Sequence, residues 1–322
     1  MAPPTWTQTI DNLFSSTWAY RKAQVVEQAY LKTPFIFWLN EAGRVEKQGG
    51  YRRIEIPVEY GNNENVRWIT KGETVPMGDN ELITLAYEDW KYVATSIVRW
   101  MTEDQQNRGK AAAIKLVDRK LGAAERALWE EFERVVFADG TGTNEPNGLK
   151  NLVAILPTSG TVHGLNRATY SWWQNQYKSA TGSAAVYLLS DMSNCMNNVI
   201  KYSRAEIKDL FIITDQTSFE LYESVHQEMK ILPNAKLADA GFDSFSYKGR
   251  PMVWSPSAPS GYMYFLNPNY LKLVIDENYW LEMTNWKEVP DQPFDKVAQI
   301  VCTMNLVCSR PVVNNVLYGV AA

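Results

Sequence analysis

The chain has 322 residues, a mass of 36.7 kDa and 45% hydrophobic residues, which suffice for the core of one large or two modest domains. Its net charge of -4, from 36 acidic residues against 32 Lys and Arg, lacks the basic excess of a protein that binds nucleic acid through phosphates. The three cysteines, Cys195, Cys302 and Cys308, have no metal-ligand or disulfide-framework spacing, which favours synthesis in a reducing cytoplasm. No stretch predicts a membrane span or a signal peptide.

The first 100 residues predict two extended elements. Residues 1–45 mix short amphipathic pieces with prolines, which predicts an arm with short helices. Alternation from 51 to 60 puts Ile54, Ile56 and Val58 on one face of a half-buried strand, and Pro57 predicts that it is an edge strand. A second alternating run, 90–98, follows a Gly- and Asn-rich segment. The two runs predict a long β-hairpin over residues 46–100.

A change of period from two to 3.6 predicts one long helix over residues 102–138. Thr102 suits its N-cap, and Asp139-Gly140 suits its end. The helix has a single apolar stripe, formed by Ile114, Val117, Leu121, Ala124, Leu128, Phe132 and Val135. Because charged residues fill the rest of its surface, we expect the helix to lie across a surface and not inside a core.

The remaining chain predicts an α+β or mixed α/β body. Residues 139–185 are rich in turn residues. After them we expect helices near 190–205 and 218–228, a buried strand at 210–214, strands near 252, 263–267 and 271–275, and two or more strands from 295 to 320.

Half of the 12 tryptophans fall in the predicted arm and hairpin: Trp6, Trp18, Trp38, Trp68, Trp90 and Trp100. Neither element can bury these rings alone, since a lone two-stranded hairpin is marginal in water. We therefore expect neighbouring subunits to cover them, with tryptophan as the interface anchor. The alternative is that the arm and the hairpin fold back on their own body and extend its core.

The sequence offers little for catalysis. Its only histidines are His163, expected in a solvated loop, and His226, expected on a helix surface. The glycine-rich segment 140–150 lacks the Gly-Lys-Ser/Thr of a phosphate loop. The carboxylates Glu130, Glu131 and Glu133 would point in different directions from a helix, so we interpret them as a solvated face. We predict no catalytic, metal or cofactor site and no enzyme activity.

Several local stretches resemble the major capsid proteins of tailed bacteriophages, the Hong Kong 97 type. The hairpin segments 56–61 and 87–91 are similar to strands of the family's E-loop, and segments 140–149 and 164–175 are similar to those that follow its spine helix. Further similar segments are 211–215, 247–253 and 262–267. The resemblance covers nearly the whole chain, and it lies in the order of these segments more than in any single one.

This resemblance implies an α+β capsid fold with a defined domain map. Residues 1–45 would be the N-terminal arm, 46–100 the E-loop hairpin, and 101–185 the P domain with the spine helix 102–138. Residues 186–310 would be the mixed α/β A domain, and 311–322 a C-terminal strand that returns to the P domain.

The implied function is a virion subunit, made in the bacterial cytoplasm, that assembles as pentamers and hexamers into an icosahedral head around double-stranded DNA without sequence specificity. Implied partners are other copies of the chain, a portal protein, and scaffolding, protease and decoration proteins, with no cofactor and no membrane. The residues expected at subunit interfaces are Trp6, Trp18, Ile56, Trp68, Lys71 and Trp90.

Two features limit what the resemblance implies. Some family members join subunits by a Lys to Asn isopeptide bond assisted by a Glu, and Lys71 lies near the hairpin tip. Lys296 and Thr303 stand where those members have the Asn and the Glu, so we expect no cross-link. No fused scaffold precedes the arm, so we expect a separate scaffolding protein or none. The alternatives are an encapsulin-like shell around protein cargo and, from a different class, a soluble hydrolase or transferase with an unrecognised site.

Overall fold

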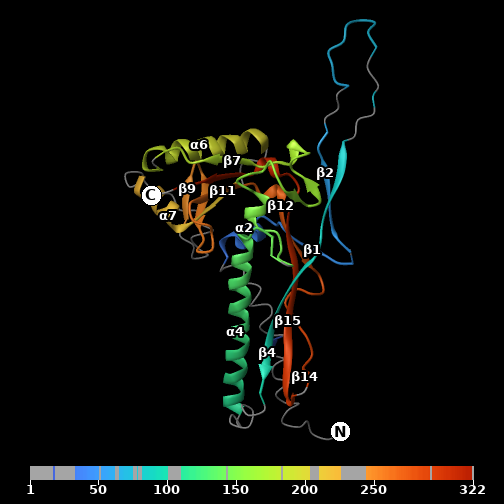
Figure 1. Cartoon of the computed structure of the whole chain (residues 1–322), viewed down its shortest axis with the longest axis vertical. Coiled ribbons are helices and arrows are strands. Elements are labelled where there is room, and N and C mark those ends of the chain that lie inside the picture. The colour runs from blue at the N-terminus through green and yellow to red at the C-terminus, as the bar shows by residue number, and fades with distance from the viewer. Residues whose placement is uncertain are drawn as a thin grey trace.

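A long helix, a long strand and a projecting hairpin give the molecule its outline (Figure 1). The computed structural model describes residues 17–18, 33–50, 52–61, 65–74, 78, 82–100, 110–142, 144–182, 184–203, 210–225, 244–290 and 292–320. Helix α4 (Lys110–Val136) and strands β4 (Lys91–Arg99) and β15 (Gln292–Cys308) run side by side as an elongated limb below the body. Strands β2 (Ile54–Glu59) and β3 (Ile83–Glu88) form a hairpin that projects on the other side.

Helix α4 has 27 residues, which at 1.5 Å per residue makes it about 40 Å long. Its predicted stripe is buried from Leu121 through Leu128 to Val135, which confirms that one face packs on the fold. The side chains of Ile114 and Val117 and the expected cap Thr102 lie outside the described residues. At the C-terminal end the amides of Phe137 and Ala138 bond to carbonyls three residues earlier, and Gly140 takes a φ of 68°. The helix therefore ends where Asp139-Gly140 predicted.

The limb sheet is built around β15, a strand of 17 residues. Along one edge it pairs antiparallel with β12 (Leu271–Asp276), β13 (Glu282–Met283) and β14 (Lys287–Val289), and along the other with β4. Strand β1 (Val45–Gln48) adds to the outer side of β12 in parallel. Helix α4 packs along β4, and Lys120 Nζ donates to the carbonyl of Val98 at 2.7 Å.

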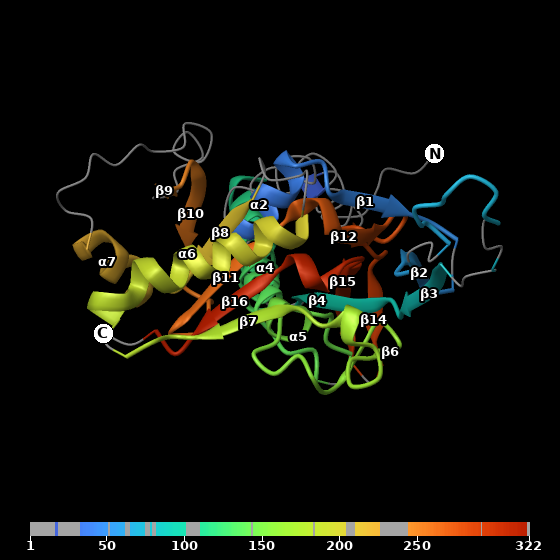
Figure 2. The ribbon, with the colours of Figure 1, turned by 90° about the horizontal axis from the view of Figure 1, so that it is seen from above.

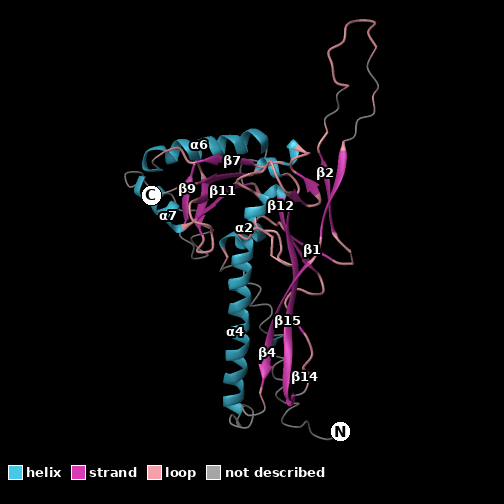
Figure 3. Cartoon of the chain, viewed as in Figure 1, coloured by secondary structure: helices cyan, strands magenta, loops and turns pink. Residues whose placement is uncertain are grey.

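A second six-stranded sheet forms the body, in the order β7-β16-β11-β8-β10-β9. These strands are β7 (Gln176–Ser179), β16 (Asn315–Tyr318), β11 (Tyr262–Leu266), β8 (Phe211–Thr214), β10 (Arg250–Trp254) and β9 (Ser244–Tyr247). Helices α6 (Ala184–Ser203) and α7 (Gln216–Val225) pack on one face through Met192, Val199 and Phe219 (Figures 2 and 3). The other face joins the central core that also receives α4.

Short elements connect these layers. They are α2 (Pro34–Glu41), α5 (Leu149–Leu152), β5 (Thr161–Val162), β6 (Leu165–Asn166) and the 3-10 turns Ser171–Trp173, Pro268–Tyr270 and Pro311–Val313. Through Phe35 and Leu39, α2 enters the central core, which also contains Trp18 and Trp38. For these two rings the folded-back alternative is therefore correct.

The α+β class is confirmed, but two details of the predicted organisation are wrong. The partner of β2 is β3, whereas the run 90–98 is β4 and pairs with β15. The last strand, β16, lies in the body sheet between β7, which belongs to the segment 101–185, and β11. The segment 186–310 is divided, because β12 and most of β15 belong to the limb sheet. In each case local alternation located the strand but carried no information about its partner.

Phe132→Ala should lower the free energy of unfolding by about 3–5 kcal/mol, because the ring is fully buried between Trp129 and Trp280 at centroid distances of 5.1 and 5.8 Å. Glu130→Ala, an exposed position on the same helix, is the matched control and should change it by less than about 0.5 kcal/mol. Urea unfolding of the unassembled subunit measures both. A loss below about 1 kcal/mol for Phe132→Ala would show that this aromatic cluster does not hold the helix.

Candidate subunit-contact surfaces

The hairpin is held against the body by one of its faces. Ile54, Ile56 and Val58 of β2 are buried with Ala86 of β3, and this face packs on Trp173, Val274 and Val307. Ile56, expected at a subunit interface, is therefore covered by its own chain. Its alternation correctly predicted a buried face, but the cover comes from the body and not from a neighbour.

The outward face of the hairpin carries a row of apolar side chains that the sequence reasoning missed. Ile83, Leu85 and Tyr87 alternate along β3 and are all exposed. Opposite them in the register stand Glu59, Pro57 and Glu55 of β2. This outward row could have been found from the sequence, because residues 83–88 alternate as clearly as residues 54–59.

The hairpin tip presents a fully uncovered indole. Trp68 has a relative exposure of 101%, and Val66 and Ile69 beside it are also exposed. The tip is ordered by local bonds: the carboxylate of Glu73 accepts from the Thr70 amide and hydroxyl, each at 3.0 Å. An aromatic side chain covers 150–250 Å², so burial of Trp68 is worth roughly 4–6 kcal/mol at 25 cal/mol per Å². The tip lies beyond the body in Figure 1, so this area is available to another molecule.

The other expected contact residues divide between exposed and buried positions. Lys71 is exposed in the same tip turn as Trp68. Trp18 is buried in the central core, and its indole N–H donates to the carbonyl of Leu281 at 3.3 Å. Trp90 is half-buried against the cluster at the hairpin root. Trp6 lies outside the described residues. Of the predicted set, the structure leaves Trp68 and Lys71 open to a neighbour.

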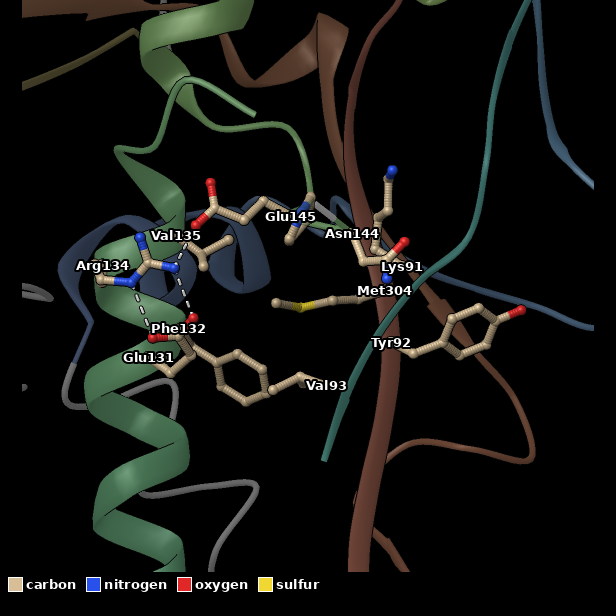
Figure 4. Close-up of a pocket in the computed structure, with 11 residues that line it drawn as sticks. Lys91, Tyr92, Val93, Glu131, Phe132, Arg134, Val135, Asn144, Glu145 and Met304 are labelled. Atoms are coloured by element: carbon tan, nitrogen blue, oxygen red, sulfur yellow. Dashed lines mark hydrogen bonds and ion pairs between the residues drawn. The ribbon is translucent and has the colours of Figure 1, made fainter. Parts of the chain in front are cut away.

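A cavity of about 420 Å³ lies between the end of α4, β4, β15 and the loop 144–146 (Figure 4). Val93, Phe132 and Met304 form its apolar part. At its rim, Arg134 donates to the carboxylates of Glu131 and Glu145, each at 2.7 Å. These bonds raise the pKa of Arg134, and the bond to Arg134 lowers the pKa of Glu131. Both carboxylates are therefore paired, and among the eleven lining residues shown none is a His, Cys or Ser nucleophile.

His163 is not the solvated residue that its loop predicted, since only 1% of its surface is exposed. Its Nδ1 lies 2.9 Å from the Glu88 carboxylate, and its Nε2 accepts from the Cys308 amide at 3.0 Å. The backbone at His163 has a φ of 51° and at Gly164 a φ of 76°, a left-handed turn that directs the ring inward. His226 lies outside the described residues.

The remaining residues considered for chemistry are the carboxylates of α4 and the cysteines. Glu130 is exposed, while Glu133 accepts from the Ser255 hydroxyl at 2.8 Å. All three cysteines are free and buried. Burial raises the pKa of Cys195 and of Cys308 to about 12, so neither thiol is an activated nucleophile at neutral pH.

No group of three or more His, Cys, Asp or Glu side chains among the described residues could hold a metal ion. No described helix combines the length and the apolar content needed to cross a bilayer.

Stability should depend on pH through Glu88. Burial raises the pKa of this carboxyl, but hydrogen bonds from His163, Asn147 and the Asp89 amide outweigh burial, so the pKa lies below the ordinary 4.5. A lowered folded pKa means that the stabilisation is complete above pH 4.5 and is lost as pH falls through the folded value. Wild type should therefore lose more unfolding free energy between pH 7 and pH 3 than Glu88→Gln, which keeps an acceptor for His163. Urea unfolding at several pH values measures this, and an equal pH dependence in the two proteins would contradict it.

The similarity of this chain to known proteins lies in its fold. No model of a protein family matches the chain, and no curated protein matches it in sequence. Among solved structures, a subunit of the cyanophage A-1(L) capsid is similar over 91% of this chain and 94% of its own, with a TM-score of 0.70 and 16% identity. The capsid of Myoviridae phage XM1 matches over 87% and 90%, with a TM-score of 0.56 and 12% identity.

A shell protein of another kind is also similar. The holo-SrpI encapsulin complex from Synechococcus elongatus PCC 7942 matches over 87% of this chain and 86% of its own, with a TM-score of 0.56 and 11% identity. At these identities the likeness is one of fold. The chain has the fold of tailed-phage capsid proteins of the Hong Kong 97 type.

Proposed function

We propose that this protein is a major capsid protein, whose copies assemble as pentamers and hexamers into the icosahedral head that encloses phage double-stranded DNA. The observation that carries the proposal is a capsid-type fold whose hairpin extends an uncovered apolar tip, centred on Trp68, away from its own body. Solved structures that are similar to this chain in fold include those of two phage capsids.

The hairpin suits a contact that repeats around a ring. In a head-to-tail contact, the tip and the outward row of one copy meet a different surface of its neighbour. Such head-to-tail contacts close into rings when the rotation between copies allows it. The function is then geometric, and the affinity is divided among many moderate interfaces in a closed lattice.

The net charge of the chain fits a shell that encloses DNA better than a protein that binds a specific DNA sequence. A net charge of -4 supplies no excess of cations for phosphate, so the shell confines DNA without reading its sequence. In this proposal the partners are other copies of the chain, a portal protein, and scaffolding, protease and decoration proteins. Synthesis takes place in the host cytoplasm, and no cofactor is involved.

Subunits in this proposal associate without a covalent cross-link. Lys71 is exposed at the hairpin tip, where an isopeptide donor would have to lie. Thr303, however, is buried, and Lys296 is paired in the sheet with Arg99. Neither residue supplies the amide or the carboxylate that such a bond requires.

An encapsulin-like nanocompartment is a second candidate, because the encapsulin complex matches the fold with the same TM-score as the phage XM1 capsid. The two functions differ in what the shell encloses. Genes for a portal and a terminase beside the gene for this chain, with DNA inside native particles, would identify a capsid. Protein cargo without DNA would identify a nanocompartment.

The protein expressed alone and together with its genomic neighbours should form closed shells, or rings of five or six subunits, because the apolar tip needs a partner surface. Size-exclusion chromatography and negative-stain electron microscopy measure this. A monodisperse monomer or small dimer under every condition would overturn the proposed function.

Trp68→Ala should leave the subunit folded and lower the fraction of protein in closed particles at least tenfold, because it removes the largest exposed apolar group of the tip. Tyr279→Ala, an exposed ring in the loop between β12 and β13, is the matched control and should assemble normally. Sedimentation and circular dichroism report assembly and folding separately. If Trp68→Ala abolished soluble, folded subunits instead, the ring would belong to a core and not to a contact.

A further inference from the structure

Among the described residues, the strands of the hairpin pair only with each other, so the direction of the hairpin depends on how its root is attached. The inner face packs on Trp173, Val274 and Val307, and apolar packing of this kind is non-directional. Directed polar contacts are instead concentrated at the end of β3, around Tyr87, Glu88 and Asp89. The angle of the hairpin is therefore determined by these contacts.

His163 makes three of these contacts at once. Its carbonyl accepts from the Tyr87 amide at 3.1 Å, its Nδ1 lies 2.9 Å from the Glu88 carboxylate, and its Nε2 lies 3.0 Å from the Cys308 amide. A backbone amide can only donate, so Nε2 must be the acceptor and Nδ1 must carry the proton that is donated to Glu88. The ring thus joins β3 of the hairpin to β15 of the limb.

Two neighbours complete this attachment. The ring of Tyr87 lies so close to Gly164 that a Cβ at that position would be 2.8 Å from it, which only glycine avoids. Asn305 accepts from the Asn147 amide at 2.9 Å and donates to the carbonyl of Asp89 at 2.8 Å. We call His163, Gly164 and Asn305 the hairpin anchor.

We propose that His163 is a positioning residue for assembly, which sets the direction in which the hairpin leaves the body by bridging Glu88 and the Cys308 amide. This inference rests on the proposed function. The six paired residues of each strand span roughly 20 Å at 3.3 Å per residue, so a rotation of about 10° at the root moves their far end by about 3.5 Å. That displacement is a full contact distance, so a loosened anchor changes which surface of a neighbour the tip meets.

The test compares His163→Ala, which loses both ring contacts, with His163→Asn. The Asn amide replaces Nδ1 as donor to Glu88, and Asn tolerates the positive φ of this position. Val199→Ala is the matched control for general destabilisation, because it shortens a fully buried side chain of α6 far from the anchor. If His163→Ala does not fold, the comparison rests on His163→Asn.

Two readouts separate positioning from stability. Spin labels on Lys71→Cys at the tip and Lys201→Cys on α6 report the distance between hairpin and body, and the native cysteines are buried and do not react. Electron microscopy reports the yield and diameter of shells. His163→Ala should broaden the distance distribution and reduce regular shells several-fold, with partial recovery in His163→Asn. Val199→Ala should keep the wild-type distribution.

Three outcomes decide the question. An unchanged distance distribution in His163→Ala would overturn the positioning role. Equal loss of shells in His163→Ala and Val199→Ala would overturn it as well, because stability alone would explain the defect. If wild type forms no shells while His163→Ala still broadens the distribution, the proposed function fails and the control of the hairpin angle by His163 stands.

Discussion

The pairing of β15 on both of its edges is the constraint on which the other elements depend. One edge holds β12, β13 and β14, and the other holds β4 in continuous register from Lys296 to Met304. Strand β4 begins three residues after β3 ends, and α4 packs along β4. The position of the hairpin and of the helix is therefore set relative to one strand. A strand of 17 residues is about three times the usual length, and the other strands of the limb are positioned by their pairing with it.

Charged residues accompany the exposed apolar surface of the hairpin. The outward row on β3 faces Glu55 and Glu59 across the register, and Arg67 lies 3.7 Å from Glu73 beside the exposed Trp68. Charged residues of this kind on an edge limit unspecific strand pairing without covering the apolar side chains. By contrast, Trp18 and Trp38 contribute to the core of the subunit itself. The same residue type thus stabilises the fold in one place and offers a contact in another.

Periodicity in the sequence correctly predicted which face of a strand or helix is buried, but it did not predict which strands pair. Alternation at Ile54–Val58 and the stripe from Leu121 to Val135 were confirmed, because burial of one face leaves a local pattern. The predicted partner of β2 was wrong, because a strand's pattern does not encode its neighbour. The prediction that His163 lies in a solvated loop was wrong because its partners Glu88 and Cys308 are 75 and 145 residues away in the sequence. Among the candidate contact residues, Trp68 could be chosen from the sequence, because it lies in a hairpin that cannot bury it alone. The burial of Ile56 depends on contacts with the body, which the sequence does not show.

The same distinction, between local patterns and contacts that are distant in the sequence, helps to explain how proteins with one fold can share very little sequence. Burial patterns can be satisfied by many side chains of similar character, so the helix, the sheets and the hairpin persist as identity falls. The angle between hairpin and body has no such tolerance, because hydrogen bonds are directional. The bonds of His163 and Asn305 to the end of β3 come from segments far apart in the chain and depend on particular atoms. The direction of the hairpin therefore depends on a few polar contacts at its root, whereas the apolar pattern specifies only that a hairpin exists.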